Sequence, residues 1–285
     1  MPWYQAPAKI NLGLWVGARD ASGYHPVDTV MQTVALSDQL YLEPRDYMLW
    51  ESTQSSLPMD DQNLVVRAYG WAKQRKPDLP CVYGRLHKVT WIGAGLGGGS
   101  SDAAALIRWA FAGSEELRHP DFLGQSAQLG MDVPFFIVGG AARAQGYGER
   151  LETVPSLSAG GVVLANPGVV LSTAAVYRAF DEVGGHGRES DAIAAVVQAL
   201  TDGQWPEEED LHNDLESAAF RVMPSLRDFR DLMRSAADGA ALALSGSGPT
   251  YYIFGRDEDW AQWMAQRLVL RGVPLVHATT VLESW

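Results

Sequence analysis

A glycine-rich stretch from Gly93 to Asp102 has the residue types in this sequence that point most directly to chemistry. It reads Gly-Ala-Gly-Leu-Gly-Gly-Gly-Ser-Ser-Asp, and an alanine-rich run that predicts a helix follows it over residues 103–112. Glycine permits positive φ angles and a close approach of the backbone to a ligand. Successive backbone N–H groups in such a loop, with the free N–H groups of a helix N-terminus, form an anion site. The stretch therefore predicts a phosphate-binding loop rather than a flexible linker.

The flanking sequence separates the kinds of phosphate site that this glycine spacing allows. The dinucleotide-binding pattern G-x-G-x-x-G is satisfied at Gly93, Gly95 and Gly98. That fold also requires a second strand that ends in an acidic residue about 20 positions later. Residues 113–129 read instead as a turn and another helix. A P-loop enzyme requires a lysine before the hydroxyl residue, and Gly99 stands there. A dinucleotide oxidoreductase and a P-loop enzyme are therefore disfavoured.

Two charged residues, Lys9 and Asp132, could serve a reaction at this loop. Lys9 belongs to a half-buried strand predicted over residues 8–16, where alternation places it beside Asn11 on the less apolar face. Asp132 precedes a proline and an apolar run at 135–138 that predicts a strand. Each residue has an ordinary structural alternative, a solvent-facing lysine and a turn aspartate that binds its own backbone. The residues alone leave both interpretations open.

Helices and strands are mixed in both halves of the chain without strict βαβ alternation, which predicts an α+β fold. Strands are expected over 8–16, 30–36, 39–43, 48–52, 82–89, 135–138, 141–145, 150–154, 162–165, 240–245, 251–255 and 273–280. Helices are expected from Asn63, after the glycine loop, and over 120–129, 174–180, 191–200, 211–220, 226–237 and 260–270. Ser100 or Ser101 is expected to cap the helix after the loop, with Asp102 in its first turn. A Pro-, Ser- and Gly-rich segment at 155–161 suggests two domains, 1–157 and 158–285.

Composition and charge narrow the classes of partner. The 285 residues carry a net charge of −12, which argues against a nucleic-acid backbone or an anionic membrane as the main partner. No apolar run reaches the ~20 residues of a membrane-spanning helix, and residues 1–16 lack the pattern of a secretory signal. Cys81 is the only cysteine, so no disulfide within the chain is possible and a reducing compartment is favoured. We therefore expect a cytoplasmic protein that binds neither nucleic acid nor a membrane.

The glycine loop and two further motifs resemble those of the GHMP kinase superfamily. Residues 95–104 match its phosphate loop, residues 7–12 its first motif and residues 244–250 its third, glycine-rich motif, in the same order along the chain. Trp91 stands where the superfamily usually has a proline. The resemblance implies a two-domain α+β fold, with mixed sheets that have helices on one side and an active site in the cleft between the domains. It also implies ATP as co-substrate and Mg²⁺ as cofactor.

Five shorter motifs are similar to those of superfamily members that phosphorylate a cytidyl diphosphate sugar alcohol in isoprenoid precursor synthesis. They are Gly23-Tyr24-His25 and the runs at 61–64, 130–136, 146–149 and 213–216. They imply an ATP-dependent kinase whose small-molecule acceptor is such an alcohol. A kinase of the homoserine or mevalonate type and a nucleotide-binding regulator without turnover are the alternatives. Aromatic residues at the expected acceptor site argue against the first alternative, and the lysine and aspartate described above argue against the second.

The resemblance also implies roles for individual residues. Asp132 would orient the acceptor hydroxyl and take its proton, while Lys9 would hold Asp132 and balance the developing charge. The residues implied to bind ATP are Asn63, Leu64, Lys88, Gly93, Ala94, Gly95, Leu96, Gly97, Gly98, Gly99, Ser100 and Ser101. The residues implied to bind the acceptor are Asn11, Tyr24, His25, Thr173, Tyr177, Ser245, Gly246, Ser247 and Gly248. Among these, Tyr24 and Tyr177 would sandwich the cytosine ring, and His25 would bind its edge. Spacing assigns no metal ligand, although Ser100 or Ser101 could contact a Mg²⁺ ion held mainly by the ATP phosphates.

Overall fold

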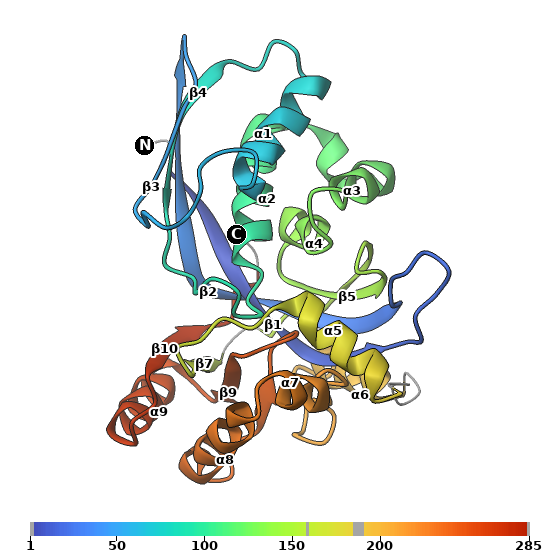
Figure 1. Cartoon of the computed structure of the whole chain (residues 1–285), viewed down its shortest axis with the longest axis vertical. Coiled ribbons are helices and arrows are strands. Elements are labelled where there is room, and N and C mark those ends of the chain that lie inside the picture. The colour runs from blue at the N-terminus through green and yellow to red at the C-terminus, as the bar shows by residue number, and fades with distance from the viewer. Residues whose placement is uncertain (1–2, 158–159, 185–190, 284–285) are drawn as a thin grey trace.

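Two β-sheets form the framework of the protein, and each belongs mainly to one half of the chain (Figure 1). The computed structural model describes residues 3–157, 160–184 and 191–283. Both halves combine a sheet with helices, so the predicted α+β class is confirmed. No helix in this described part of the chain is long and apolar enough to cross a membrane.

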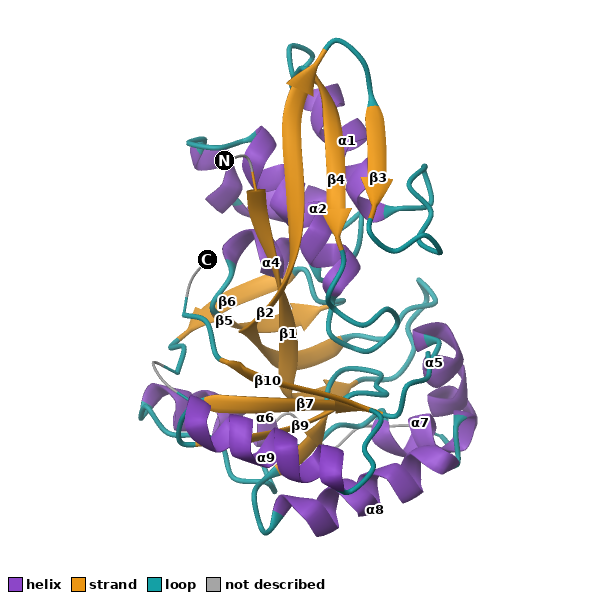
Figure 2. Cartoon of the chain, turned by 90° about the vertical axis from the view of Figure 1, so that its left-hand side faces the viewer, coloured by secondary structure: helices purple, strands orange, loops and turns teal. Residues whose placement is uncertain are grey.

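The N-terminal half contributes a six-stranded sheet with helices on one face. Its strands are β1 (Trp3–Val16), β2 (Val27–Arg45), β3 (Leu49–Ser52), β4 (Cys81–His87), β5 (Ala141–Gly146) and β6 (Arg150–Val154). Neighbouring strands are antiparallel except for β3 and β4. The helices are α1 (Leu64–Arg75), α2 (Gly98–Ala110), α3 (Pro120–Ser126) and α4 (Val133–Val138), with a 3₁₀ turn at Glu115–Arg118. Figure 2 shows α1, α2 and α4 behind this sheet.

The C-terminal half contributes a four-stranded antiparallel sheet in the order β10-β7-β9-β8. Its strands are β7 (Gly161–Asn166), β8 (Leu242–Leu244), β9 (Tyr251–Gly255) and β10 (Leu275–Thr280). Its helices are α5 (Thr173–Glu182), α6 (Asp191–Thr201), α7 (Glu216–Val222), α8 (Ser225–Ala237) and α9 (Glu258–Leu270). Helices α8 and α9 lie on the outer side of this sheet (Figures 1 and 2). Helix α6 instead packs against β1 and β2, which joins the two halves through one apolar cluster.

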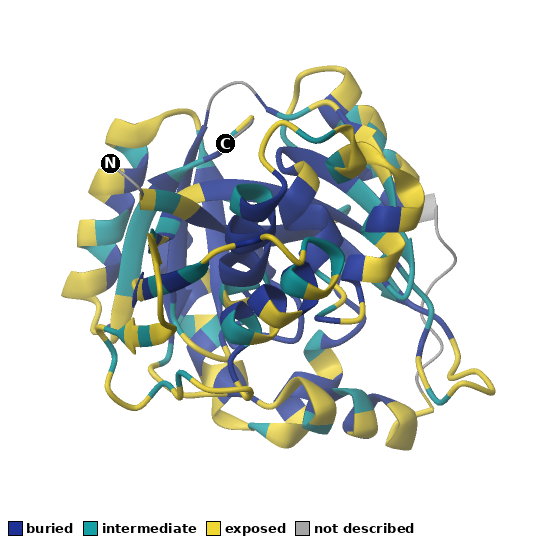
Figure 3. Ribbon diagram, turned by 90° about the horizontal axis from the view of Figure 1, so that it is seen from above, coloured by how far each residue is buried: buried dark blue, intermediate teal, exposed yellow. Residues whose placement is uncertain are grey.

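Strand β1 is buried on both faces, so the expectation of a half-buried strand is wrong. Its apolar side chains, such as Ile10 and Leu12, pack in the cluster that contains residues of α6, β7 and β9. The polar side chains of Lys9 and Asn11 do not face bulk water, because they are only 4% and 5% exposed. Figure 3 shows the buried ribbon concentrated where sheets and helices meet. Buried polar side chains need hydrogen-bonding or charged partners, so this face of β1 is a candidate for a functional site.

The apolar run predicted as a strand at 135–138 is a helix, α4. Pro134 occupies one of its first positions, where the fixed φ of proline suits a helix start. All of its residues from Val133 to Ile137 are buried, so the run shows no polar face. Periodicity cannot separate a short helix that is buried on all sides from a buried strand.

Other expected boundaries also differ from the structure. The segments expected as two strands, 30–36 and 39–43, form the single strand β2, because Ser37 and Asp38 between them also pair with β1. The helix expected over 211–220 begins only at Glu216. Asn213 and Asp214 bind backbone groups of other elements through their side chains, which holds residues 211–215 outside the helix. The helix expected over 120–129 ends at Ser126.

Candidate active site

A cavity of about 1000 Å³ lies between the two halves of the protein. Its wall includes β1, the glycine loop, the loop before α4 and the first turns of α5. The residues expected from the sequence that line it are Lys9, Asn11, Tyr24, His25, Asn63, Leu64, Lys88, Gly93, Ala94, Gly95, Leu96, Gly97, Gly98, Gly99, Ser100, Asp132, Thr173, Tyr177, Gly246 and Ser247. Three expected residues are buried behind the wall: Ser101, Ser245 and Gly248.

Lys9 and Asp132 meet in this cavity. The Lys9 ammonium lies 3.6 Å from a carboxylate oxygen of Asp132, and their side chains are 5% and 33% exposed. Lys9 also donates to Asn11 Oδ1 at 2.5 Å, and Asn11 in turn donates to Thr29 Oγ1 at 3.0 Å. Asp132 stands at the start of α4, yet its side chain makes no capping hydrogen bond. The carboxylate thus faces Lys9 and the cavity instead of the backbone of its own turn.

The glycine loop opens onto the same cavity and leads into α2. Gly95 and Gly97 have φ angles of +77° and +70°, which residues with a side chain rarely adopt. Gly97 is the N-cap of α2, so the expectation that Ser100 or Ser101 caps this helix is wrong. Both serines lie within its first turns. Ser100 lines the cavity, whereas the hydroxyl of Ser101 is buried with no hydrogen-bond partner.

A buried charge cluster lies beneath the glycine loop. The Lys88 ammonium contacts Asp38 Oδ2 at 2.6 Å and Asp102 Oδ2 at 2.7 Å. Burial lowers the pKa of Lys88, but the negative charges of Asp102 and Asp38 outweigh this and raise it overall. Burial raises the pKa of Asp102 to about 7, against the lowering effect of Lys88. The sequence predicted Asp102 in the first turn of α2, where a carboxylate would interact with the helix dipole. In the structure Asp102 lies beyond the first turn, so this prediction is wrong. Its ion pair with Lys88 ties α2 to the strand that leads into the loop.

A second glycine turn, residues 245–248, packs against the first loop. A Cβ atom at Gly95 would lie 2.1 Å from the carbonyl oxygen of Ser245, so only glycine fits there. Beside the turn, the hydroxyls of Ser247 and Thr173 are 2.8 Å apart. The turn therefore links the glycine loop to α5.

Aromatic and charged side chains surround the end of the cavity near α5. The rings of His25 and Tyr177 are 5.4 Å apart, and burial raises the pKa of Tyr177 to about 12 with a further contribution from the charge of Asp132. His25 Nε2 lies 3.1 Å from Asp181 Oδ1, and Nδ1 lies 2.9 Å from the carbonyl oxygen of Gly17. Both ring nitrogens thus already have partners in the protein. These two contacts hold the His25 ring in place at the cavity wall.

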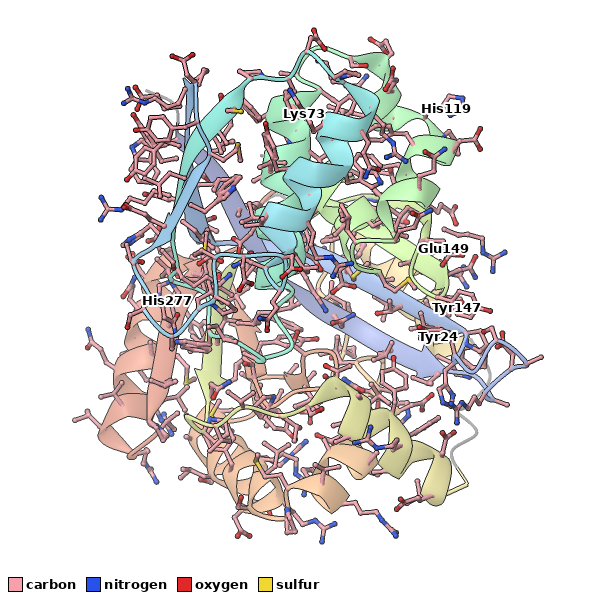
Figure 4. All side chains as sticks on the ribbon, turned by 45° about the horizontal axis from the view of Figure 1, so that its top comes forward. Tyr24, Lys73, His119, Tyr147, Glu149 and His277 are labelled. Carbon is pink, nitrogen blue, oxygen red and sulfur yellow. The ribbon has the colours of Figure 1, made fainter. Side chains whose placement is uncertain are left out.

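Three residues in this region were missed by the sequence analysis: Arg19, Tyr147 and Asp181. Tyr147 lies beside the exposed Tyr24, with their ring centres 5.8 Å apart (Figure 4). It belongs to the motif at 146–149, so a signal for it was present in the sequence. Asp181 follows Tyr177 by one helical turn and contacts both His25 and Arg19. Nothing in the local sequence links Asp181 to residues of the β1–β2 loop.

At the opposite end of the cavity, Asn63 and Leu64 begin α1. The Asn63 side chain caps this helix, accepting from the backbone N–H of Val65 at 3.0 Å, and it also donates to the carbonyl of Pro58. Trp91 lines the cavity and packs on the apolar cluster shared by the two halves. Among the described residues, no group of three or more His, Cys, Asp or Glu side chains is arranged to hold a metal ion.

Comparison with known proteins identifies the family. Residues 63–140 match the GHMP kinases N terminal domain, and residues 191–269 match the GHMP kinases C terminal domain. The 4-diphosphocytidyl-2-C-methyl-D-erythritol kinase of Caulobacter vibrioides (strain NA1000 / CB15N) is 36% identical, covering 92% of this chain and 93% of its own. A crystal structure of a 4-(cytidine 5'-diphospho)-2C-methyl-D-erythritol kinase superposes with a TM-score of 0.77 at 33% identity and covers 98% of both chains. A homoserine kinase from Cytophaga hutchinsonii has a TM-score of 0.72 but only 16% identity, with 100% of this chain and 96% of its own covered, so it shows the shared fold alone. The chain is thus a small-molecule kinase that uses ATP and belongs to the GHMP kinases and, within them, to the family of the 4-diphosphocytidyl-2-C-methyl-D-erythritol kinases.

Proposed function

We propose that this protein transfers the γ-phosphoryl group of ATP to the 2-hydroxyl of 4-diphosphocytidyl-2-C-methyl-D-erythritol, a step of the non-mevalonate (MEP) route to isoprenoid precursors. The observation that carries the proposal is the Lys9–Asp132 pair, 3.6 Å apart, in the cavity that also holds the glycine loop. The aromatic end of the same cavity gives room for a pyrimidine base beside Tyr24, His25 and Tyr177. The names of the relatives support the choice of acceptor.

The geometry supports a direct transfer between the two bound substrates. The backbone N–H groups of the glycine loop and the N-terminus of α2 would bind the ATP phosphates. Asp132 would accept a hydrogen bond from the acceptor hydroxyl and receive its proton as the bond to phosphorus forms. Lys9 would hold the Asp132 carboxylate in place and balance the charge that develops on the transferred group. The hydrogen bond from Lys9 to Asn11 limits where the ammonium can lie.

We further propose that Mg²⁺ accompanies ATP. The oxygen donors on the cavity wall near the loop, the Ser100 hydroxyl and the Asp132 carboxylate, are of the type that Mg²⁺ prefers. Since no cluster of three acidic or imidazole side chains is arranged for a metal among the described residues, the ATP phosphates and water would supply most ligands. The ion would neutralise phosphate charge during transfer. Ser100 is the better candidate than Ser101, whose hydroxyl is buried.

The remaining parts of the proposal concern organisation and location. We place the domain boundary at 157/158, between β6 and β7, where residues 158–159 lie outside the described part of the chain. The negative net charge supports small molecules, and not nucleic acid, as partners. The single cysteine supports the cytoplasm as the compartment.

A direct assay tests the activity. The purified protein is incubated with ATP, Mg²⁺ and either the cytidyl diphosphate alcohol, homoserine or mevalonate, and ADP and the phosphorylated product are measured. We expect product with the cytidyl substrate alone, and loss of most product with Asp132→Asn. Product with homoserine or mevalonate would instead support another kinase of the superfamily. ATP binding without any product would indicate a regulator.

A further inference from the structure

A side chain outside the cavity holds the second glycine turn in place. The amide of Asn213 donates to the carbonyl oxygens of Leu244 at 2.9 Å and Gly246 at 2.8 Å. Its own oxygen accepts from the backbone N–H of Leu215 at 2.9 Å. Asn213 is 8% exposed, so water cannot readily replace these bonds. Both N–H groups and the oxygen of the amide are thus used, which fixes its orientation.

One of the two carbonyls that Asn213 binds belongs to Gly246, which lies close to Lys9 and Asn11. Gly246 has a φ angle of +56°. A Cβ atom on it would lie 3.3 Å from Asn11 Oδ1 and 3.5 Å from the Lys9 ammonium. The backbone of Gly246 therefore forms part of the wall that confines Lys9 and its partner Asn11. A shift of this turn changes the space in which the Lys9 ammonium sits.

The segment that carries Asn213 is also fastened to the strand that carries Lys9. Leu14 donates its N–H to the carbonyl of His212 at 2.8 Å and accepts from the N–H of Asp214 at 3.0 Å. Asp214 accepts from the N–H of Val16 at 2.8 Å. Residues 212–214 thus bind β1 with their backbone and the glycine turn with the Asn213 side chain. They set the separation between the strand and the turn.

We propose that Asn213 is a positioning residue for phosphoryl transfer, which acts by holding Gly246 against Lys9 and Asn11. The motif at 213–216 thereby acquires a role that its sequence alone does not suggest. The inference rests on the proposed role of Lys9 in the reaction. Asn213 lies outside the cavity wall, so it acts through Gly246 and not by touching a substrate itself.

Asn213→Asp is the sharpest test, because it keeps the shape but places a carboxylate against two carbonyl oxygens. We expect kcat to fall by about 10- to 100-fold, because a small misplacement of the reacting groups slows the transfer step, with KM for ATP changed by less than about threefold. Asn213→Gln, which retains both N–H groups, is expected to recover part of kcat.

Asn166→Ser is the matched control. Asn166 is also buried and donates to Thr250 at the far end of the same turn, but it does not bind Gly246. Its kcat should stay within about twofold of the wild type.

A second measurement does not depend on turnover. The rate at which an amine-reactive reagent modifies Lys9 is measured by mass spectrometry, with Lys73 in the last turn of α1 as internal reference (Figure 4). We expect faster modification of Lys9 in Asn213→Asp and no change at Lys73. If Asn213→Asp does not fold, as judged by circular dichroism, Asn213→Ser is measured in its place. Unchanged kcat and unchanged Lys9 reactivity in a folded variant would overturn the inference. A wild-type protein that is inactive on the cytidyl substrate would overturn the proposed function, while the Lys9 reactivity would still test Asn213.

Discussion

The hydroxyl of Ser245 donates a hydrogen bond to the carbonyl oxygen of Gly95 at 2.9 Å. This bond joins two glycine turns that come from opposite halves of the chain and meet beside the Lys9–Asp132 pair. The glycine loop is therefore not an independent module. Its geometry depends on contacts with the C-terminal half.

Gly95→Ala should damage the contact between the two turns. The new Cβ atom would lie 2.1 Å from the Ser245 carbonyl oxygen at a φ of +77°. We expect the free energy of unfolding to fall by about 1–3 kcal/mol, the range for a strained backbone site, and ADP to bind more weakly. Urea unfolding and a titration with ADP measure both. Gly124→Ala is the control, because nothing lies within 4 Å of its Cβ position, and it should not destabilise the protein. Equal stability of the two variants would contradict the clash.

Asp132→Asn should abolish most turnover while ADP still binds. An amide cannot take the proton of the acceptor hydroxyl, so kcat should fall by roughly 10²- to 10⁴-fold. The Asp132 side chain is one-third exposed and makes no capping bond, so the free energy of unfolding should change little. Single-turnover kinetics and ADP titration separate these effects. Asp121→Asn, at an 85% exposed side chain, is the control. Near-normal turnover in Asp132→Asn would exclude the proposed role.

Tyr177→Ala should weaken binding of the cytidyl substrate in particular. Base stacking on an aromatic ring is worth about 1–3 kcal/mol, which corresponds to a rise in KM of about 5- to 150-fold. KM for ATP should stay within about twofold, because Tyr177 belongs to the α5 end of the cavity. Initial-rate kinetics with each substrate varied in turn give both values. Tyr47→Ala, at an exposed position, controls for the loss of a tyrosine. An equal rise in KM for both substrates would argue against stacking.

Asp102→Asn should change how stability depends on pH. Burial raises the pKa of Asp102 to about 7, whereas its ordinary value is 3.8. Between these values the folded protein holds a proton that the unfolded chain has released, so the free energy of unfolding falls as pH rises. The stability that Asp102 contributes through its raised pKa is fully present below pH 3.8 and is lost as pH rises through about 7. We therefore expect the wild type to lose stability relative to Asp102→Asn as pH increases across this window.

Urea unfolding at a series of pH values tests this expectation. Subtracting the free energy of unfolding of Asp102→Asn from that of the wild type removes the contribution of every titrating group that the substitution leaves unchanged. Lys88 keeps Asp38 as a partner in the variant, so the cluster does not lose its only anion. Asp121→Asn should show a curve parallel to the wild type. Parallel curves for Asp102→Asn as well would show that Asp102 does not hold a proton in the folded state.

The sequence by itself determined the position of the glycine loop and the family. The glycines of residues 93–99 are required by local backbone geometry, which depends on residue type more than on distant contacts. The motifs around Lys9, the loop and Ser245 occur in a fixed order along the chain, so the sequence was sufficient to predict the α+β class and the kinase family. Their roles in catalysis and binding remain predictions for the experiments above.

Only the tertiary structure decided which side chains meet. The strand predicted at 135–138 is a helix, because burial on every side removes the periodicity that distinguishes the two. Lys9 is buried although the residues alone favoured a solvent-facing lysine, since the glycine turn from the other half covers that face of β1. The partners of Lys88 and of His25 come from elements far along the chain. Contacts of this kind depend on how the two sheets pack together, and no local pattern of residues encodes that packing.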